Sequence, residues 1–218
     1  MLNIFDVDYT IIKKTSAWYF IREALAEKTI GISQIKKLPL EWLRYKMGIL
    51  NIDFIEEAVK HLGGLDKKTV EAVAQACFVR RMKSGIYEKA AQLISQMQKR
   101  GEQVILATSS FQTIIQPLQR FLGIGESISS ELEFANGKTT GRISGASVFG
   151  ANKKTAVESW LSARHIQPHD ACFYSDSYTD IPLMEYCGSA VAVNPDRFLE
   201  REAKKRGWQI MRFHRTLG

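Results

Sequence analysis

The N-terminal stretch Met1-Leu2-Asn3-Ile4-Phe5-Asp6-Val7-Asp8-Tyr9-Thr10 carries the strongest fold signal in the chain. It is mostly apolar up to Phe5, and acids appear only where this run ends, which predicts a buried β-strand. Because side chains alternate between the two faces of a strand, Asp6 and Asp8 would project together at its end, about 6 to 7 Å apart along the chain. Two carboxylates on one side repel each other, so they favour a cation, a shared proton or separate environments.

Four further apolar runs have the length of short strands and end in polar residues. They are 103–107, 171–174, 190–193 and 209–211. Apolar residues at helical spacing fill the intervals, over 86–97, 114–122 and 157–161. Alternating strands and helices predict an α/β fold, a doubly wound, Rossmann-like parallel sheet with helices on both faces. Ligands of such sheets bind at the carboxyl ends of the strands, where distant polar clusters meet.

Residues 15–83 do not follow this alternation. They show no strand pattern but several helical stretches, over 16–27, 32–47 (broken near Pro39), 53–62 and 66–82. We expect 15–83 to form an inserted all-helical cap domain that closes over the first acidic cluster, and 1–14 with 84–218 to form the core domain. Within the core, an Asn136-Gly137 turn predicts a β-hairpin over 131–143.

The composition is that of a globular protein of one or two domains, with 218 residues, 45% of them hydrophobic and 24% charged. No apolar run reaches the roughly 18 to 20 residues that span a bilayer, and the N-terminus lacks the pattern of a signal peptide. We therefore expect a cytoplasmic protein with no membrane partner. Cys77, Cys172 and Cys187 lack metal-ligand spacing, which suits a reducing compartment and disfavours zinc.

The net charge of +7 would attract acidic partners, including phosphorylated metabolites and nucleic acid. Basic residues concentrate in 196–218, a pattern typical of a solvated surface. The chain has no basic stripe interleaved with aromatic residues, the pattern of single-strand binding, which disfavours nucleic acid.

Acids at a second strand end extend the first cluster. Asp176 and Asp180 follow the strand 171–174, and the topology brings them to the same sheet edge as Asp6 and Asp8. Oxygen ligands of this kind suit a hard divalent cation, so the sequence predicts a Mg²⁺ site.

Residues suited to an anion accompany the acids. Thr108 and Ser109 follow the strand 103–107 just before a predicted helix, whose N-terminal N–H groups attract negative charge. Lys153, or its neighbour Lys154, begins the helix before the Asp176 strand and would supply a positive charge for phosphate. Carboxylate nucleophile, Mg²⁺, hydroxyl and ammonium together indicate phosphoryl transfer.

The order of these residues resembles the haloacid dehalogenase (HAD) superfamily of phosphohydrolases. Its four motifs match Asp6/Asp8/Thr10, Thr108, Lys153 and Asp176/Asp180, over nearly the whole chain. The helical insert after the first motif is similar to subfamily IB, which includes phosphoserine phosphatase, and 175–180 with 191–196 looks like its SerB-like bacterial members. The spacing to Asp176 fits Lys153 better than Lys154.

The resemblance implies a Mg²⁺-dependent phosphomonoester hydrolase that acts on a small phosphorylated metabolite through an aspartyl-phosphate. Asp6 would be the nucleophile and Asp8 the general acid and base. The metal ligands implied are Asp6, the backbone carbonyl of Asp8, and Asp176. The remaining implied roles are phosphoryl binding by Thr108, Ser109 and Lys153, bracing of the loop by Thr10, and orientation from behind by Asp180.

Three positions depart from the family pattern. Tyr9 stands where many relatives have Gly or Ser, and Ser175 where they usually have Gly, so we expect both loops to differ in shape. Thr15 lies nine residues after Asp6, where phosphoserine phosphatases carry a Glu for the substrate amine. An unpaired ammonium would cost several kcal/mol, so we expect phosphoserine not to be the best substrate. Aromatic residues of the cap offer a surface for a larger apolar or cationic substrate instead: Trp18, Tyr19, Phe20, Trp42 and Tyr45.

Two other classes of protein share part of this chemistry. A receiver-type signalling domain also uses an acidic pair, a Thr or Ser and a Lys, but its phosphorylated Asp lies on a later strand and it has no helical insert. A non-catalytic phospho-ligand binding protein would not need the nucleophile and acid/base pair. Among small substrates, phosphoserine, histidinol phosphate and phosphocholine remain the alternatives.

Overall fold

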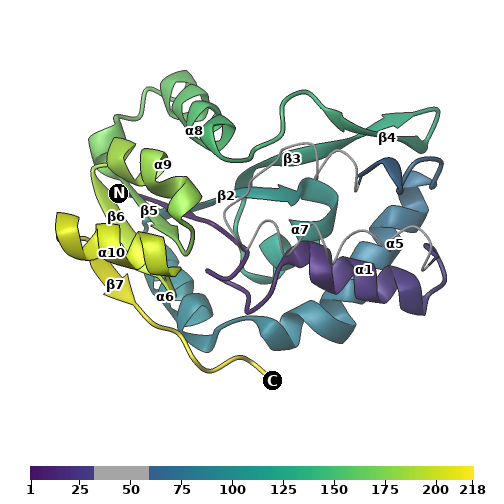
Figure 1. Ribbon diagram of the computed structural model, residues 1–218, viewed down its shortest axis with the longest axis horizontal. Coiled ribbons are helices and arrows are strands. Elements are labelled where there is room, and N and C mark those ends of the chain that lie inside the picture. The colour runs from purple at the N-terminus through teal and green to yellow at the C-terminus, as the bar shows by residue number, and fades with distance from the viewer. Residues whose placement is uncertain (32–58) are drawn as a thin grey trace.

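The computed structural model describes residues 1–31 and 59–218, and its centre is a seven-stranded sheet with the order β4-β3-β2-β1-β5-β6-β7 (Figure 1). Neighbouring strands run parallel except β3 and β4, which are antiparallel. The strands are β1 (Leu2–Phe5), β2 (Gln103–Phe111), β3 (Glu126–Ala135), β4 (Lys138–Ser144), β5 (Ala171–Ser175), β6 (Ser189–Val193) and β7 (Gln209–Met211).

Helices cover both faces of this sheet, which makes the fold doubly wound as the sequence predicted. Buried residues of α6 and α7 pack on one face, and those of α8, α9 and α10 pack on the other. The described α-helices are α1 (Ser16–Ala26), α5 (Lys67–Cys77), α6 (Glu88–Lys99), α7 (Gln112–Phe121), α8 (Ala151–Ala163), α9 (Ile181–Tyr186) and α10 (Arg197–Arg206).

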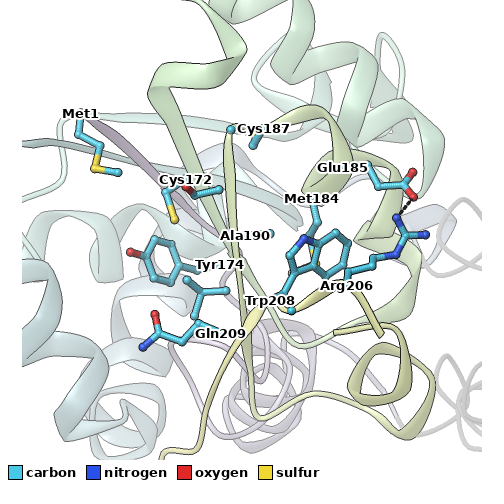
Figure 2. Close-up of a pocket in the computed structure, with 14 residues that line it drawn as sticks. Met1, Cys172, Tyr174, Met184, Glu185, Cys187, Ala190, Arg206, Trp208 and Gln209 are labelled. Atoms are coloured by element: carbon cyan, nitrogen blue, oxygen red, sulfur yellow. Dashed lines mark ion pairs between the residues drawn. The ribbon is translucent and has the colours of Figure 1, made fainter. Parts of the chain in front are cut away.

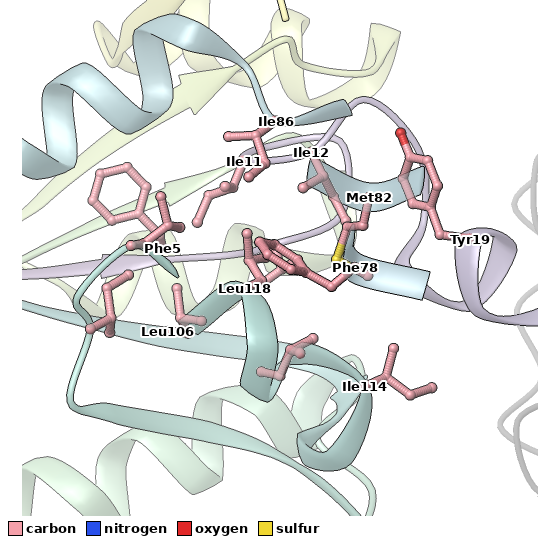
Figure 3. Packing of buried hydrophobic residues seen from close by; sticks show 14 of the residues in the cluster. Phe5, Ile11, Ile12, Tyr19, Phe78, Met82, Ile86, Leu106, Ile114 and Leu118 are labelled. Carbon is pink, nitrogen blue, oxygen red and sulfur yellow. The ribbon is translucent and has the colours of Figure 1, made fainter. Parts of the chain in front are cut away.

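Strand β1 lies in the middle of the sheet and contributes side chains to the hydrophobic clusters on both of its faces, because its side chains alternate between faces. Phe5 stacks on Tyr174 of β5, with ring centroids 4.1 Å apart, and belongs to the cluster shown in Figure 3. Ile4 belongs to the other cluster, together with Phe173. Burial on both faces explains why β1 reads as an almost continuous apolar run.

Strand β2 is longer than predicted. The polar residues after Ala107 looked like its end, but the strand continues to Phe111, with a shift of register against β3 between Thr108 and Phe111. Such a bulge keeps the backbone in the sheet while changing where the side chains point.

The predicted hairpin also differs from the observed one in extent. The turn at Asn136 and Gly137 has φ values of 50° and 76°, the left-handed geometry that an Asn-Gly sequence favours. However, β3 begins at Glu126 and pairs in parallel with β2 before it turns into β4. Residues 126–130 contain one apolar side chain, Ile128, so periodicity gave no signal for a strand there.

The described part of the predicted cap packs on the core. Helices α1 and α5 lie together at one end of the molecule in Figure 1, and buried residues of both belong to the same cluster as Phe5. The predicted helix over 66–82 is α5 followed by a π-helical turn, Phe78–Met82. Glu23 of α1, almost fully buried, forms ion pairs with Arg80 (2.7 Å) and Arg81 of that turn.

The domain limits at 15 and 83 remain a prediction. The whole of the predicted helix over 32–47 and residues 53–58 of that over 53–62 lie outside the described residues. Across the described ranges, no helix is both long and apolar enough to cross a membrane.

The basic C-terminal segment forms ion pairs on the surface. Lys204 and Arg212 both pair with Glu200, at 2.9 and 2.6 Å, and Arg206 pairs with Glu202 at 3.2 Å. This is the solvated face that the charge pattern predicted.

We expect Phe5→Ala to lower the free energy of unfolding by about 3 to 5 kcal/mol, because it opens a cavity where the ring of Phe5 stacks on that of Tyr174. The matched control is Phe198→Ala, which removes a ring that is 39% exposed and should cost less than about 1 kcal/mol. Urea unfolding of both variants measures the difference; equal losses would contradict the packing described for β1.

Candidate active site

The first acid of the sequence motif lies at the carboxyl edge of the sheet. Asp6 follows β1 and its N–H donates to the carbonyl of Tyr174 on β5, at 2.9 Å. Asp176 follows β5, the strand beside β1, so parallel pairing brings these two acids to adjacent strand ends. Segments about 170 residues apart in the sequence therefore meet at one edge.

Lys153 connects two of the acids. It lies in the first turn of α8, almost fully buried, and its Nζ is 3.1 Å from Oδ1 of Asp6 and 2.8 Å from Oδ2 of Asp180. Its neighbour Lys154 instead pairs with Glu158 on the surface, at 3.3 Å. Of the two candidate lysines, the structure brings Lys153 to the acidic cluster.

Asp180 is held from two sides. Its Oδ2 accepts hydrogen bonds from Lys153 and from the hydroxyl of Ser175, the latter at 2.6 Å, while its Oδ1 is buried without a partner. The family resemblance led us to expect Gly at position 175, and the Ser175 hydroxyl is instead a hydrogen-bond donor to Asp180. The sequence marked Ser175 as a departure but gave no signal for this contact.

The loop after Asp6 winds back on itself. Tyr9 has a φ of 58°, in the left-handed region that a bulky residue rarely occupies, and the N–H groups of Ile11 and Ile12 both donate to the carbonyl of Val7. Thr10 is fully buried, with its hydroxyl 3.5 Å from Oδ1 of Asp176. A left-handed backbone at position 9 is the geometry that Gly adopts without strain, which fits the Gly that the family resemblance led us to expect there alongside Ser.

Asp8 is hydrogen-bonded by two serines that the sequence did not single out as site residues. The backbone N–H of Ser16 donates to its Oδ1 at 2.8 Å, and the hydroxyl of Ser110 donates to the same oxygen at 3.3 Å. Ser16 is the first residue of α1 and Ser110 lies on β2, so the carboxyl group is held between the predicted cap and the core.

Thr108 lies deeper than its predicted role suggests. It is fully buried, and its Oγ1 accepts a hydrogen bond from the N–H of Ser110 at 3.2 Å. Ser109 is half-buried on the bulged part of β2. In the described structure neither side chain hydrogen-bonds to Asp6 or Lys153.

Burial and mutual repulsion shape the ionisation of the acids. Burial raises the pKa of Asp6 to about 7, with Lys153 opposing and Asp180 and Asp8 adding to the shift. Burial, then repulsion from Asp6 and Asp180, raises the pKa of Asp176 well above its usual value. Burial would lower the pKa of Lys153, but Asp180 and Asp6 outweigh it and raise that pKa, so its ammonium stays charged. The cluster therefore favours added positive charge.

A family model described as haloacid dehalogenase-like hydrolase matches residues 4–185 of the chain. The chain belongs to this family. A histidinol-phosphatase of Neisseria meningitidis is 31% identical over 97% of this chain and 98% of the relative. Phosphoserine phosphatase SerB1 of Mycobacterium tuberculosis is 27% identical over 96% of this chain and 70% of the relative.

Among solved structures, a protein of unknown function from Bordetella pertussis has a TM-score of 0.87 at 24% identity, over 96% of this chain and 97% of that one. This likeness establishes the shared fold. The family match and the named relatives show that the chain is a HAD phosphatase that resembles SerB. This confirms the assignment made from the four motifs.

The acidic cluster fits the Mg²⁺ that the HAD family generally uses. Within residues 1–31 and 59–218, no group of three Asp, Glu, His or Cys side chains could hold a metal ion. The predicted ligand set needs only two side chains, Asp6 and Asp176, because its third member is the backbone carbonyl of Asp8. Repulsion from Asp6 adds to burial in raising the pKa of Asp176, and a divalent cation between the two carboxylates would relieve that repulsion.

A hollow of about 780 Å³, whose lining residues are shown in Figure 2, has none of the acidic cluster in its lining. Its lining includes Met1, Cys172 and Gln209, which lie at or just before the amino ends of β1, β5 and β7, with Arg206 paired to Glu185 at its rim. Since the HAD site lies at the carboxyl ends, this hollow contains none of the predicted site residues.

Of the aromatic residues proposed for substrate packing, the three that the structure describes are in contact with the protein's own side chains. Tyr19 and Phe20 are buried, and the ring of Trp18 is covered by Lys14 and Arg22, at 4.0 and 4.7 Å. Trp42 and Tyr45 lie outside the described residues. In the described part of α1, the predicted aromatic surface is thus occupied by the protein's own side chains.

The stability of the metal-free enzyme should fall as the pH rises from about 4 to about 6. Burial raises the pKa of Asp8 from 3.8 to about 6, so the folded state keeps a proton there that the unfolded chain has lost. Over this window we expect wild type to lose roughly 2 kcal/mol more stability than Asp8→Asn, which has no such proton. Urea unfolding in EDTA at several pH values measures this; parallel curves for the two proteins would contradict it.

Proposed function

We propose that this HAD phosphatase hydrolyses the phosphomonoester of a small metabolite through an aspartyl-phosphate formed on Asp6. The contact of Lys153 with both Asp6 and Asp180 carries the proposal. It places a buried ammonium beside the carboxylate that would attack phosphorus, where it can bind phosphoryl oxygens and offset their charge.

The first chemical step forms one bond and breaks another. An oxygen of Asp6 attacks phosphorus while the ester P–O bond breaks, and Asp8 gives its proton to the departing alcohol oxygen. Asp8 is then a carboxylate, ready to act as a base.

The second step regenerates the enzyme. Asp8 takes a proton from water, whose oxygen attacks phosphorus, and the bond from phosphorus to Asp6 breaks to release inorganic phosphate. Burial holds the pKa of Asp8 near 6, so it can both give and accept a proton near neutral pH.

Mg²⁺ would be held by Asp6, Asp176 and the backbone carbonyl of Asp8, and it would supply positive charge next to the phosphoryl oxygens. We assign phosphoryl binding to Thr108, Ser109 and Lys153. Asp180 would orient Lys153, in keeping with their 2.8 Å contact, and Thr10 would brace the loop beside Asp176.

The experiment that tests this proposal is turnover of p-nitrophenyl phosphate with Mg²⁺ and with EDTA. We expect turnover only with Mg²⁺, and a loss of at least roughly 1,000-fold in kcat for Asp6→Asn, because the nucleophile is removed. Asp170→Asn, which changes an exposed carboxylate, is the control and should keep wild-type activity. Full activity of Asp6→Asn, or an inactive wild type, would overturn the proposal.

The substrate is proposed to be an ester other than phosphoserine, and histidinol phosphate is the leading candidate. Thr15 directly precedes Ser16, whose N–H contacts Asp8, and the Thr15 hydroxyl caps α1 by accepting the N–H of Trp18 at 3.1 Å. Position 15 therefore lies near the site but offers no charge to an α-amine. The Neisseria meningitidis relative named histidinol-phosphatase supports this ranking.

We expect kcat/KM for histidinol phosphate to exceed that for phosphoserine by at least about 10-fold, a difference of about 1.4 kcal/mol. Thr15→Glu should lower this ratio of kcat/KM values, because it supplies a carboxylate for the amine of phosphoserine. Thr15→Gln also removes the hydroxyl that caps α1 but adds no charge, so it should leave the ratio unchanged. A steady-state comparison of both esters decides the ranking. Phosphoserine as the better substrate of wild type would contradict it.

A further inference from the structure

We infer that Ser110 and Ser16 are positioning residues that hold the carboxyl group of Asp8, so that one of its oxygens is fixed and the other faces the leaving group. The inference rests on the proposed role of Asp8 as general acid and base. It concerns two residues that belong to none of the four HAD motifs matched in this chain.

Both donors bind the same oxygen of Asp8. The N–H of Ser16 is 2.8 Å from Oδ1 and the hydroxyl oxygen of Ser110 is 3.3 Å from it. The N–H of Ser16 lies at the start of α1, among the helix N–H groups that have no partner within the helix. A carboxyl oxygen there satisfies one of these donors and lies at the positive end of the helix dipole.

The hydroxyl groups of the two serines form a chain with one direction. They are 2.6 Å apart and both are buried. Each hydroxyl has a single proton, and Ser110 uses its own to bind Asp8, so Ser16 donates to Ser110. In the order Ser16 to Ser110 to Asp8, the hydroxyl protons of both serines are used in hydrogen bonds.

This arrangement selects which oxygen of Asp8 carries the catalytic proton. Because Oδ1 accepts two hydrogen bonds, a proton on the carboxyl group belongs on Oδ2. The positions of Ser16 and Ser110 thus set the direction in which Asp8 gives its proton to the ester oxygen. Placement of this kind matters, since a displacement of about 1 Å in an active site can cost about 100-fold in rate.

Ser110 is itself held in place by a neighbouring residue of β2, Thr108. Its backbone N–H donates to Oγ1 of Thr108 at 3.2 Å, across the bulge in β2. The bulge explains why β2 continues past its apolar run: the extended backbone carries the Ser110 hydroxyl to Asp8.

The test uses three phosphate esters of similar size whose leaving groups differ in basicity. At neutral pH, p-nitrophenolate can leave without being protonated. Phenolate is more basic, so its departure depends more on a proton from a general acid, and the alkoxide of benzyl phosphate depends on it most. In Ser110→Ala we expect kcat/KM for benzyl phosphate to fall by about 10-fold or more, phenyl phosphate to fall less, and p-nitrophenyl phosphate to stay within about twofold of wild type.

Two control variants separate positioning from a general loss of stability. Ser130→Ala also removes a buried serine hydroxyl, one that accepts a hydrogen bond from the N–H of Val148 at 2.9 Å, and it should change kcat/KM for all three esters by one common factor. Ser110→Thr keeps the hydroxyl and should retain the wild-type ratio of the benzyl to the p-nitrophenyl ester.

Equal losses on the three esters in Ser110→Ala, or no loss, would overturn the inference. If Ser110→Ala does not fold, Ser16→Ala is the test: it leaves the N–H donor but removes the hydroxyl behind Ser110, and an unchanged ester ratio would also overturn the inference. Failure of the proposed function has a different signature, because it would appear as an inactive wild type or as full activity of Asp6→Asn, and neither result depends on Ser110.

Discussion

The buried ion-pair cluster around Lys153 is the interaction on which this site depends. Its ammonium contacts Asp6 and Asp180, and repulsion from these two acids adds to burial in raising the pKa of Asp176. Removing one partner would leave a buried charge uncompensated, which is more costly than the pair is stabilising. The cluster therefore fixes α8 and the loop after β5 against the end of β1, and it places a positive charge where we propose that the phosphoryl group binds.

A second constraint acts on Asp8 from two directions. The core contributes Ser110, on a bulged strand, and the first turn of α1 contributes the N–H of Ser16. The carboxyl group proposed as acid and base is thus held where the core meets the helix that opens the predicted cap. The proposed roles of position 15 in substrate selectivity and of position 16 in proton placement fall on consecutive residues, so a change to the N-terminus of α1 would affect both.

Much of the site followed from the sequence because its residues lie directly after apolar runs. Asp6 and Asp176 could be placed at one edge because parallel strands align their carboxyl ends. The central strands were recognisable because strands buried on both faces have nearly continuous apolar sequences. The extension of β2 and the start of β3 were missed because both are polar there. Polar residues in a bulged strand have the composition of a loop, and only pairing with neighbours makes them a strand.

The sequence by itself determined the fold class, the family and the identity of the acids, since these depend on local periodicity and on residue order. Tertiary structure decided which of two adjacent lysines enters the site, because one turn of α8 directs Lys153 inward and Lys154 to the surface. It also revealed the serines around Asp8 and the support of Asp180 by Ser175. A serine hydroxyl carries no pattern of its own, and its role depends on which distant group the fold brings within hydrogen-bond distance.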